Sequence, residues 1–263
     1  MKKTVIAAAL ASTVFSGAAM AWNAGGSGGN IEIGGSIQVT PYSTPWEVMT
    51  GVPATSLDTN ITKGVSVVNI PVTKAIPVLG IRTVSKTLFT GKAEGISPEI
   101  NYGAAVNVAT FENSITTLTL PLMDASTANA GEIGTMNAKF IAAARSSSKY
   151  LDNPSHGFDI IASPDGNKHA FLGGLPQSKD KAAANSGSLA AQVFPGVEAN
   201  FNSQGVTSYS NDWMNFNGPQ TKYSAYYGAG IPANSDIKLT LTAPAANDAI
   251  KWKASLPITV SYR

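Results

Sequence analysis

Apolar and polar residues alternate in several short stretches of the chain. In Ile115–Leu122 and Ile237–Leu241 apolar side chains recur at every second position, a pattern typical of strands with one buried face. Ser66–Thr73 and Val78–Thr83 are further β-rich runs, each carrying or preceded by a proline that limits ladder pairing. Strands at this spacing, with no repeated helix between them, predict an antiparallel sandwich.

Two more alternating stretches lie near the ends of the chain. In Asn30–Val39 the apolar residues share one parity and a glycine interrupts their face: Ile31, Ile33, Gly35, Ile37 and Val39. The last stretch again keeps its apolar residues on one parity: Leu256, Ile258, Val260 and Tyr262. The first stretch follows Ala24–Gly29, whose Gly-rich sequence predicts a flexible leader.

The region from about Phe140 to Gly205 loses this strand rhythm. Its segments FIAAARSSSKYL (140–151) and KDKAAANSGSLAAQVF (179–194) are rich in alanine and predict short helices. The turn sequences PDGNK and GGLP lie between them. Because the region is short and poor in large apolar residues, we expect insertions at one end of the sandwich rather than a separate domain.

The first 21 residues have the three parts of a secretory signal. Lys2 and Lys3 precede an apolar run, which ends at the small-residue site Ala19-Met20-Ala21. A membrane-spanning helix would need roughly 20 apolar residues, and this run is shorter. We therefore predict a signal peptide at 1–21, an N-terminal arm at 22–40 and a folded domain at 41–263.

Charge argues against a nucleic-acid partner. The chain has 18 basic and 16 acidic side chains, and loss of Lys2 and Lys3 with the signal would leave no net charge. Nucleic-acid binding needs clustered Lys and Arg. The chain has no cysteine, which excludes thiol catalysis and Cys-ligated metal. The folded domain is long enough to bury a core without disulfides.

The sequence contains no convincing set of catalytic or metal-binding residues. His156 and His169 are its two histidines, and their wide spacing favours surface positions over a zinc site. Ser146–Lys149 matches the S-x-x-K signature, but the companion motifs of penicillin-recognising enzymes do not follow. Asn60–Thr62 spells a glycosylation sequon and is interpreted as a loop. We predict neither an enzyme nor a cofactor.

Aromatic residues are concentrated in Tyr209–Gly230, YSNDWMNFNGPQTKYSAYYGAG. Tyr and Trp beside Asn and Asp can stack on a sugar ring and bond its hydroxyl groups. The same aromatics can instead fill the sandwich core and brace a strand, and we favour this second interpretation. Aromatic residues of Tyr150–Phe171 are rival candidates for a sugar contact.

Three stretches together resemble the FaeG-type family of enterobacterial fimbrial subunits. They are WNAGGSGGNIEIGGSI (22–37), YSAYYGAGI (223–231) and KWKASLPITVSYR (251–263). The resemblance extends over the signal, the start of the mature chain and its C-terminal end. That family includes major subunits that are themselves adhesins and minor subunits of the same fimbria.

The resemblance implies an all-β, incomplete immunoglobulin-like sandwich that lacks its last strand. The N-terminal arm of the next subunit would complete it by donor-strand complementation. In this interpretation Ile31, Ile33, Ile37 and Val39 are donor-strand residues, and Gly35 fits a shallow part of the groove. The C-terminal residues would form the strand that contacts the chaperone and borders the groove: Leu256, Ile258, Val260 and Tyr262.

The resemblance also implies partners and a location. A periplasmic chaperone, an outer-membrane usher and other fimbrial subunits would bind the chain on its way through the periplasm to a cell-surface fimbrium. The insertion at 140–205 would contact host glycoconjugates, with glycan-binding residues unassigned. Whether the subunit is major or minor stays open. The alternatives are a free-standing secreted or periplasmic carbohydrate-binding protein and a secreted hydrolase.

Overall fold

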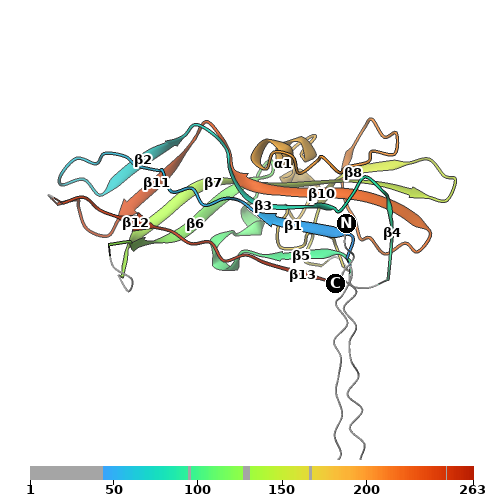
Figure 1. Ribbon diagram of the computed structural model, residues 1–263, viewed down its shortest axis with the longest axis horizontal. Coiled ribbons are helices and arrows are strands. Elements are labelled where there is room, and N and C mark those ends of the chain that lie inside the picture. Colours follow the sequence, from blue (N-terminus) through green and yellow to red (C-terminus); the bar gives the residue numbers. More distant parts are fainter. Residues whose placement is uncertain (1–43, 94–95, 127–130, 166–167, 247) are drawn as a thin grey trace, which may run out of the picture. The chain divides into compact units, whose positions relative to one another are not determined.

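The computed structural model describes residues 44–93, 96–126, 131–165, 168–246 and 248–263 (Figure 1). The predicted signal peptide and arm, with Ile31, Ile33, Gly35, Ile37 and Val39, lie outside the described residues. The part of the chain from Ser43 onward forms one compact unit. Strands are its main regular elements, which confirms the all-β, immunoglobulin-like class.

Most strands join one large sheet. Its longer strands are β2 (Val67–Val72), β3 (Ile76–Thr83), β6 (Ile115–Asp124), β7 (Glu132–Tyr150), β8 (His156–Ile161), β10 (Thr221–Ile231) and β11 (Ser235–Leu241). Its shorter strands are β1 (Trp46–Thr50), β4 (Phe89–Thr90), β9 (Ser210–Trp213) and β12 (Trp252–Lys253). A second sheet pairs β5 (Pro98–Asn101) with β13 (Thr259–Tyr262).

Strand β7 is the central strand of the large sheet. Its first half lies between β6 and β11, and its second half lies between β8 and β10. The register sets Leu239 opposite Met136 and Tyr227 opposite Ala144. All these pairings are antiparallel, whereas β8 and β9 run parallel. The alternating stretches at Ile115–Leu122 and Ile237–Leu241 therefore form strands, as predicted.

The prediction of a helix at 140–151 is wrong, because residues 140–150 belong to β7. Consecutive alanines there, Ala142, Ala143 and Ala144, are all buried. The strand is covered on both faces, so the period-2 signal of a half-exposed strand is absent. The second alanine-rich segment does become helical, in the 3-10 turn η3 (Lys179–Lys181) and in α1 (Gly187–Val193).

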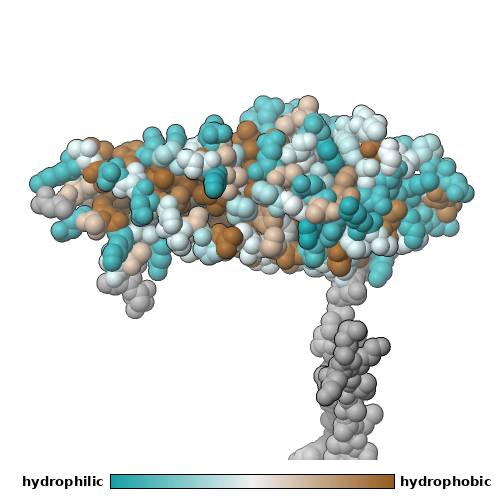
Figure 2. All heavy atoms as spheres, turned by 45° about the horizontal axis from the view of Figure 1, so that its top comes forward, coloured by the Kyte–Doolittle hydropathy of each residue, from teal (hydrophilic) through white to brown (hydrophobic). Residues whose placement is uncertain are grey.

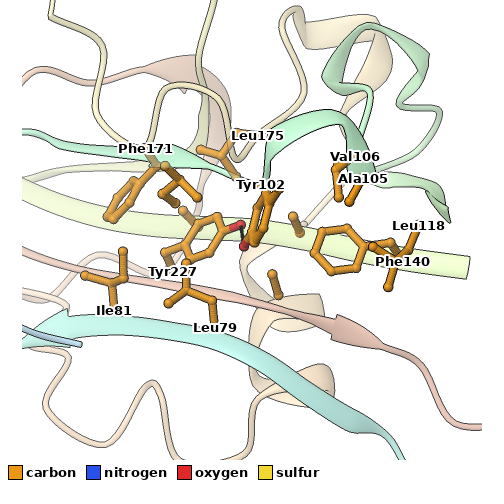
Figure 3. Packing of buried hydrophobic residues seen from close by; sticks show 14 of the residues in the cluster. Leu79, Ile81, Tyr102, Ala105, Val106, Leu118, Phe140, Phe171, Leu175 and Tyr227 are labelled. Carbon is orange, nitrogen blue, oxygen red and sulfur yellow. Dashed lines mark hydrogen bonds between the residues drawn. The ribbon is translucent and has the colours of Figure 1, made fainter. Parts of the chain in front are cut away.

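The main core lies between the large sheet and the segments that cross it (Figure 3). Leu79, Ile81 and Tyr227 come from β3 and β10, and they face side chains of the turn after β5 and of the 171–175 loop. Two short 3-10 turns, η1 (Gly103–Ala105) and η2 (Val108–Thr110), complete this layer.

Helix α1 covers the opposite face of the sheet, over β7 and β10 (Figure 1). Its residues Ala190 and Val193 are buried. Close contact requires a glycine beneath the helix, since a Cβ on Gly228 would lie 2.6 Å from the Ala190 carbonyl oxygen. Among the described residues, no helix is long and apolar enough to cross a membrane.

Both ends of the described chain are tied to one short segment. The indole N–H of Trp46, at the start of β1, donates to the carbonyl of Ile96. Arg263 and Ser97 exchange two backbone hydrogen bonds of 3.1 and 2.9 Å. The start of β1 and the C-terminus therefore lie close together, as Figure 1 shows.

Candidate interaction groove

An apolar groove of about 1180 Å³ opens on the half of the domain that holds β2, β6, β11 and β12. Figure 2 shows hydrophobic residues gathered in this left half of the view. The side chains of the floor come from β6, β7 and β11: Leu118, Leu120, Leu122, Met136, Ile237 and Leu239. All six are buried core residues, so the groove reaches the core itself.

Two segments without regular structure form the walls of the groove. One follows β1 and includes Pro53, Leu57 and Ile61, and the other includes Ala254 and Leu256. Within the described part of the chain, no backbone group of 52–61 or 254–258 forms a hydrogen bond. Unpaired N–H and C=O groups along an extended segment are a template for another strand. Among the described residues, both walls therefore leave backbone groups unpaired beside an apolar floor.

The groove brings together only part of the predicted C-terminal set. Leu256 and Ile258 line it. Val260 and Tyr262 belong to β13, which pairs with β5 and does not line the groove. Half-buried and exposed residues alternate from Trp252 to the C-terminus, and Trp252 and Ala254 also line the groove.

The groove residues Trp252 and Ala254 were not among the sequence predictions. The signal was present, because both residues continue the parity of Leu256 and Ile258 backwards in KWKASLPI. The floor residues were recognised only as strand positions. Nothing in an alternating pattern distinguishes a side chain under a groove from one under a packed layer.

The histidines differ in their placement. His156 is exposed, as predicted, whereas the prediction of a surface position for His169 is wrong, since only 8% of it is exposed. The Ser163 N–H donates to His169 Nδ1 at 3.1 Å. Burial lowers the His169 pKa, and the nearby Asp212 carboxylate opposes this effect. The imidazole is therefore favoured in its neutral form.

The S-x-x-K match has no catalytic geometry. Ser146 and Lys149 lie in β7, and residues three apart in a strand point to opposite faces. The described residues contain no His, Cys, Asp or Glu cluster that would hold a metal ion. The sequon at Asn60–Thr62 lies outside any strand or helix, in agreement with the predicted loop.

The aromatic stretch mainly fills the core, as favoured. Phe216, Tyr223, Tyr226 and Tyr227 are all buried. Tyr209 is half-buried, and Trp213, at the end of β9, has half of its surface exposed. The sheet thus uses most of these aromatics for packing and leaves one indole on the surface.

Comparison with known proteins adds the decisive observation. The family model described as "Fimbrial, major and minor subunit" matches residues 1–263. The chain belongs to this family. The fimbrial subunit is also 30% identical over an alignment of 292 residues to K88 fimbrial protein AB of Escherichia coli, with all of both chains covered. It is 28% identical over 290 residues to K88 fimbrial protein AC of Escherichia coli, again with full coverage.

Family membership fixes the general role of the fimbrial subunit. It is a structural component of a cell-surface fimbrium and interacts with other fimbrial subunits. The FaeG-type resemblance seen in the sequence is thereby confirmed over the whole chain.

Proposed function

We propose that the groove accepts the N-terminal arm of a neighbouring subunit, so that subunits join head to tail by donor-strand exchange in the chaperone–usher pathway. The observation that carries the proposal is the pair of unpaired walls, 52–61 and 254–258, on either side of a floor of buried apolar side chains. An added strand would pair with both walls and cover the floor.

The sequence of the arm suits this groove. Ile31, Ile33, Ile37 and Val39 would point toward the floor, because alternate residues of a strand share one face. Burying each of them contributes roughly 1.5–3 kcal/mol before ordering costs. Hydrogen bonds to the two walls add about 1 kcal/mol each. Such a contact dissociates very slowly.

The same geometry explains a need for a chaperone. Before assembly, the groove would leave half-buried apolar side chains of its walls and unpaired backbone groups uncovered, and both promote aggregation. A periplasmic chaperone that covers the groove would prevent this, and the outer-membrane usher would then exchange the chaperone for the arm of the next subunit. Leu256 and Ile258 line the groove and would contact either partner.

A peptide complementation experiment tests the proposal directly. The chain from Pro41 onward is refolded with and without a peptide of Trp22–Thr40, and thermal unfolding is followed. A matched control peptide carries Ile33→Asp and Ile37→Asp. We expect only the unmodified peptide to produce a cooperative transition at a much higher temperature. Cooperative melting of the truncated chain alone, unaffected by either peptide, would instead favour a free-standing carbohydrate-binding protein.

Residues of the C-terminal wall alternate between positions that line the groove and positions that are exposed, and this alternation provides a second test. Leu256→Asp puts a charge into the groove and should abolish assembly into fibres, because an unpaired buried charge is costly. Ser255→Asp changes the neighbouring, exposed position and should leave assembly unchanged. Fibre yield by size-exclusion chromatography and electron microscopy measures both. Equal yields for the two variants would contradict a strand bound on this wall.

A further inference from the structure

The predicted arm is joined to the folded domain by a short linker. The four residues Thr40–Ser43 separate Val39, the last apolar residue of the arm, from the first described residue, Thr44. Four residues span at most about 14 Å, even when fully extended. An arm bound in the groove of another subunit, as proposed above, would therefore hold its own domain against that subunit. The inference below rests on that proposed function.

The point where the arm leaves its domain is fixed at the start of β1. The Trp46 indole donates to the Ile96 carbonyl, and the Val84 N–H donates to the Pro45 carbonyl at 3.0 Å. Val84 therefore lies beside the root of the arm. Its side chain is 56% exposed, whereas Pro45 is half-buried. These two residues form an apolar surface that we call the root patch.

The two ends of the groove leave different amounts of room for a neighbouring domain. At one end the walls continue into β1 and β13, and the same domain extends beyond them to β4 and β8 (Figure 1). The five residues of β1 cover about 17 Å, which is longer than the linker. At the other end lie Ile61 and Ile250, near β2 and β12 at the left of Figure 1. The arm of a neighbour would therefore leave the groove at this second end.

Exposed apolar side chains lie at the second end. Ile250 lines the groove and is 39% exposed. Val65 is 42% exposed and does not line the groove. Backbone hydrogen bonds tie its segment to the groove residue Ala245, because the Gly64 N–H donates to the Ala245 carbonyl and the Ala245 N–H donates to the Val65 carbonyl, each at 2.9 Å. We call Val65 and Ile250 the end patch.

We propose that the root patch of one subunit packs on the end patch of the subunit whose groove holds its arm. The partner is thus a second copy of this chain, and the contact lies outside the donor strand. Packing Val84 against Val65 and Ile250 removes apolar surface from water at both patches. The arm alone joins two domains through one strand, whereas this second contact also fixes the angle between them.

Disulfide formation between subunits tests the contact in fibres of the full chain. Val84→Cys is combined with Val65→Cys in one variant and with Ile250→Cys in another. We expect at least one of them to give a ladder of linked oligomers on a non-reducing gel after mild oxidation, because a disulfide needs Cα atoms within about 7 Å. In the matched controls Leu151→Cys replaces Val84→Cys. Leu151 is also 56% exposed but follows β7, and should give no ladder.

Charge substitution measures how much the contact contributes to fibre stability. Val84→Asp would place a carboxylate against apolar side chains, and should speed the release of subunits from heated fibres at least about tenfold. Adding Val65→Lys should reverse part of this effect, because opposite charges then face each other. Leu151→Asp is the control and should release subunits at the unmodified rate. These three positions do not line the groove.

Two results would each overturn the proposal. In the first, both Val84→Cys variants form fibres without a disulfide ladder, or with no more of it than the Leu151→Cys controls. In the second, Val84→Asp and Leu151→Asp fibres release subunits equally fast. Complementation by the Trp22–Thr40 peptide is measured separately on each charge variant. A peptide that still stabilises them would show that the groove works while the second contact fails, whereas a peptide without effect on any chain would remove both proposals.

Discussion

Three buried tyrosines show how single residues stabilise the core. The hydroxyl groups of Tyr102 and Tyr227 lie 2.8 Å apart, and the Tyr227 hydroxyl also donates to the Gly174 carbonyl at 3.1 Å (Figure 3). On the other face of the sheet, the Tyr226 hydroxyl donates to the Gly187 carbonyl at 3.2 Å. Burial raises the pKa of all three phenols, that of Tyr226 to about 12.

These shifts predict alkaline unfolding. In the unfolded chain tyrosines lose their protons near pH 10, whereas Tyr226 keeps its proton in the folded state to about pH 12. The unfolded state then binds fewer protons, so the free energy of unfolding falls as the pH rises through this window. Each such tyrosine contributes a slope of up to about 1.4 kcal/mol per pH unit.

Urea unfolding at a series of pH values measures this slope, and Tyr226→Phe is expected to make it shallower. The variant lowers the free energy of unfolding at neutral pH by about 1 kcal/mol through the lost hydrogen bond. Above pH 10 the difference from the unmodified protein should shrink. An unchanged slope in Tyr226→Phe would show that this phenol does not titrate on unfolding.

Elements were predictable from the sequence where one face is exposed and the other buried. Strands β6 and β11 alternate in this way, and their positions follow from pattern alone. Strand β7 was missed at 140–150 because α1 covers one face and the core covers the other. Alanines there allow the close approach of the helix, and local propensity indicated a helix. The missing information was tertiary, not local.

The groove was predictable only in part for a related reason. The parity of the C-terminal stretch marks Leu256 and Ile258 as one face of an extended segment. It does not reveal that β5 takes Val260 and Tyr262 as partners, since that pairing joins residues far apart in the chain. The wall at 52–61 carries no alternating pattern, and its role follows only from its position.

Helix α1 should be sensitive to the glycine beneath it. Gly228→Ala would place a Cβ 2.6 Å from the Ala190 carbonyl oxygen, so the helix must move outward, at a cost of about 1–3 kcal/mol. Gly131→Ala is the matched control, because nothing lies within 4 Å of its Cβ position. Chemical denaturation of both variants measures the difference. Equal stability would mean that the helix shifts without loss of packing.

The whole molecule would be an open-ended building block. A groove on one subunit and an arm on the next make a heterologous contact, which generates a filament when it does not close into a ring. The chain has no cysteine, so introduced cysteines report this contact without interference.

A subunit carrying Ile33→Cys and Leu256→Cys should form a ladder of disulfide-linked oligomers on a non-reducing gel, because neighbouring strands bring Cα atoms within bonding range. A second pair, Ile33→Cys with Ile258→Cys, tests a donor strand shifted by two residues along the C-terminal wall. Ile33→Cys with Ser255→Cys is the control and should give little product, because Ser255 points away from the groove. Equal cross-linking in all three pairs would argue against an ordered donor strand.

The shared attachment of Trp46 and Arg263 to the Ile96–Ser97 segment has a mechanical consequence. A fibre under tension would pull on each subunit through the chain entering β1 and through the strand bound beside the C-terminal wall. Force would pass through the β1–β3 and β5–β13 ladders. Helix α1 and the Trp213 edge lie off this route. Exposed positions there would therefore tolerate substitution without weakening the fibre against drag.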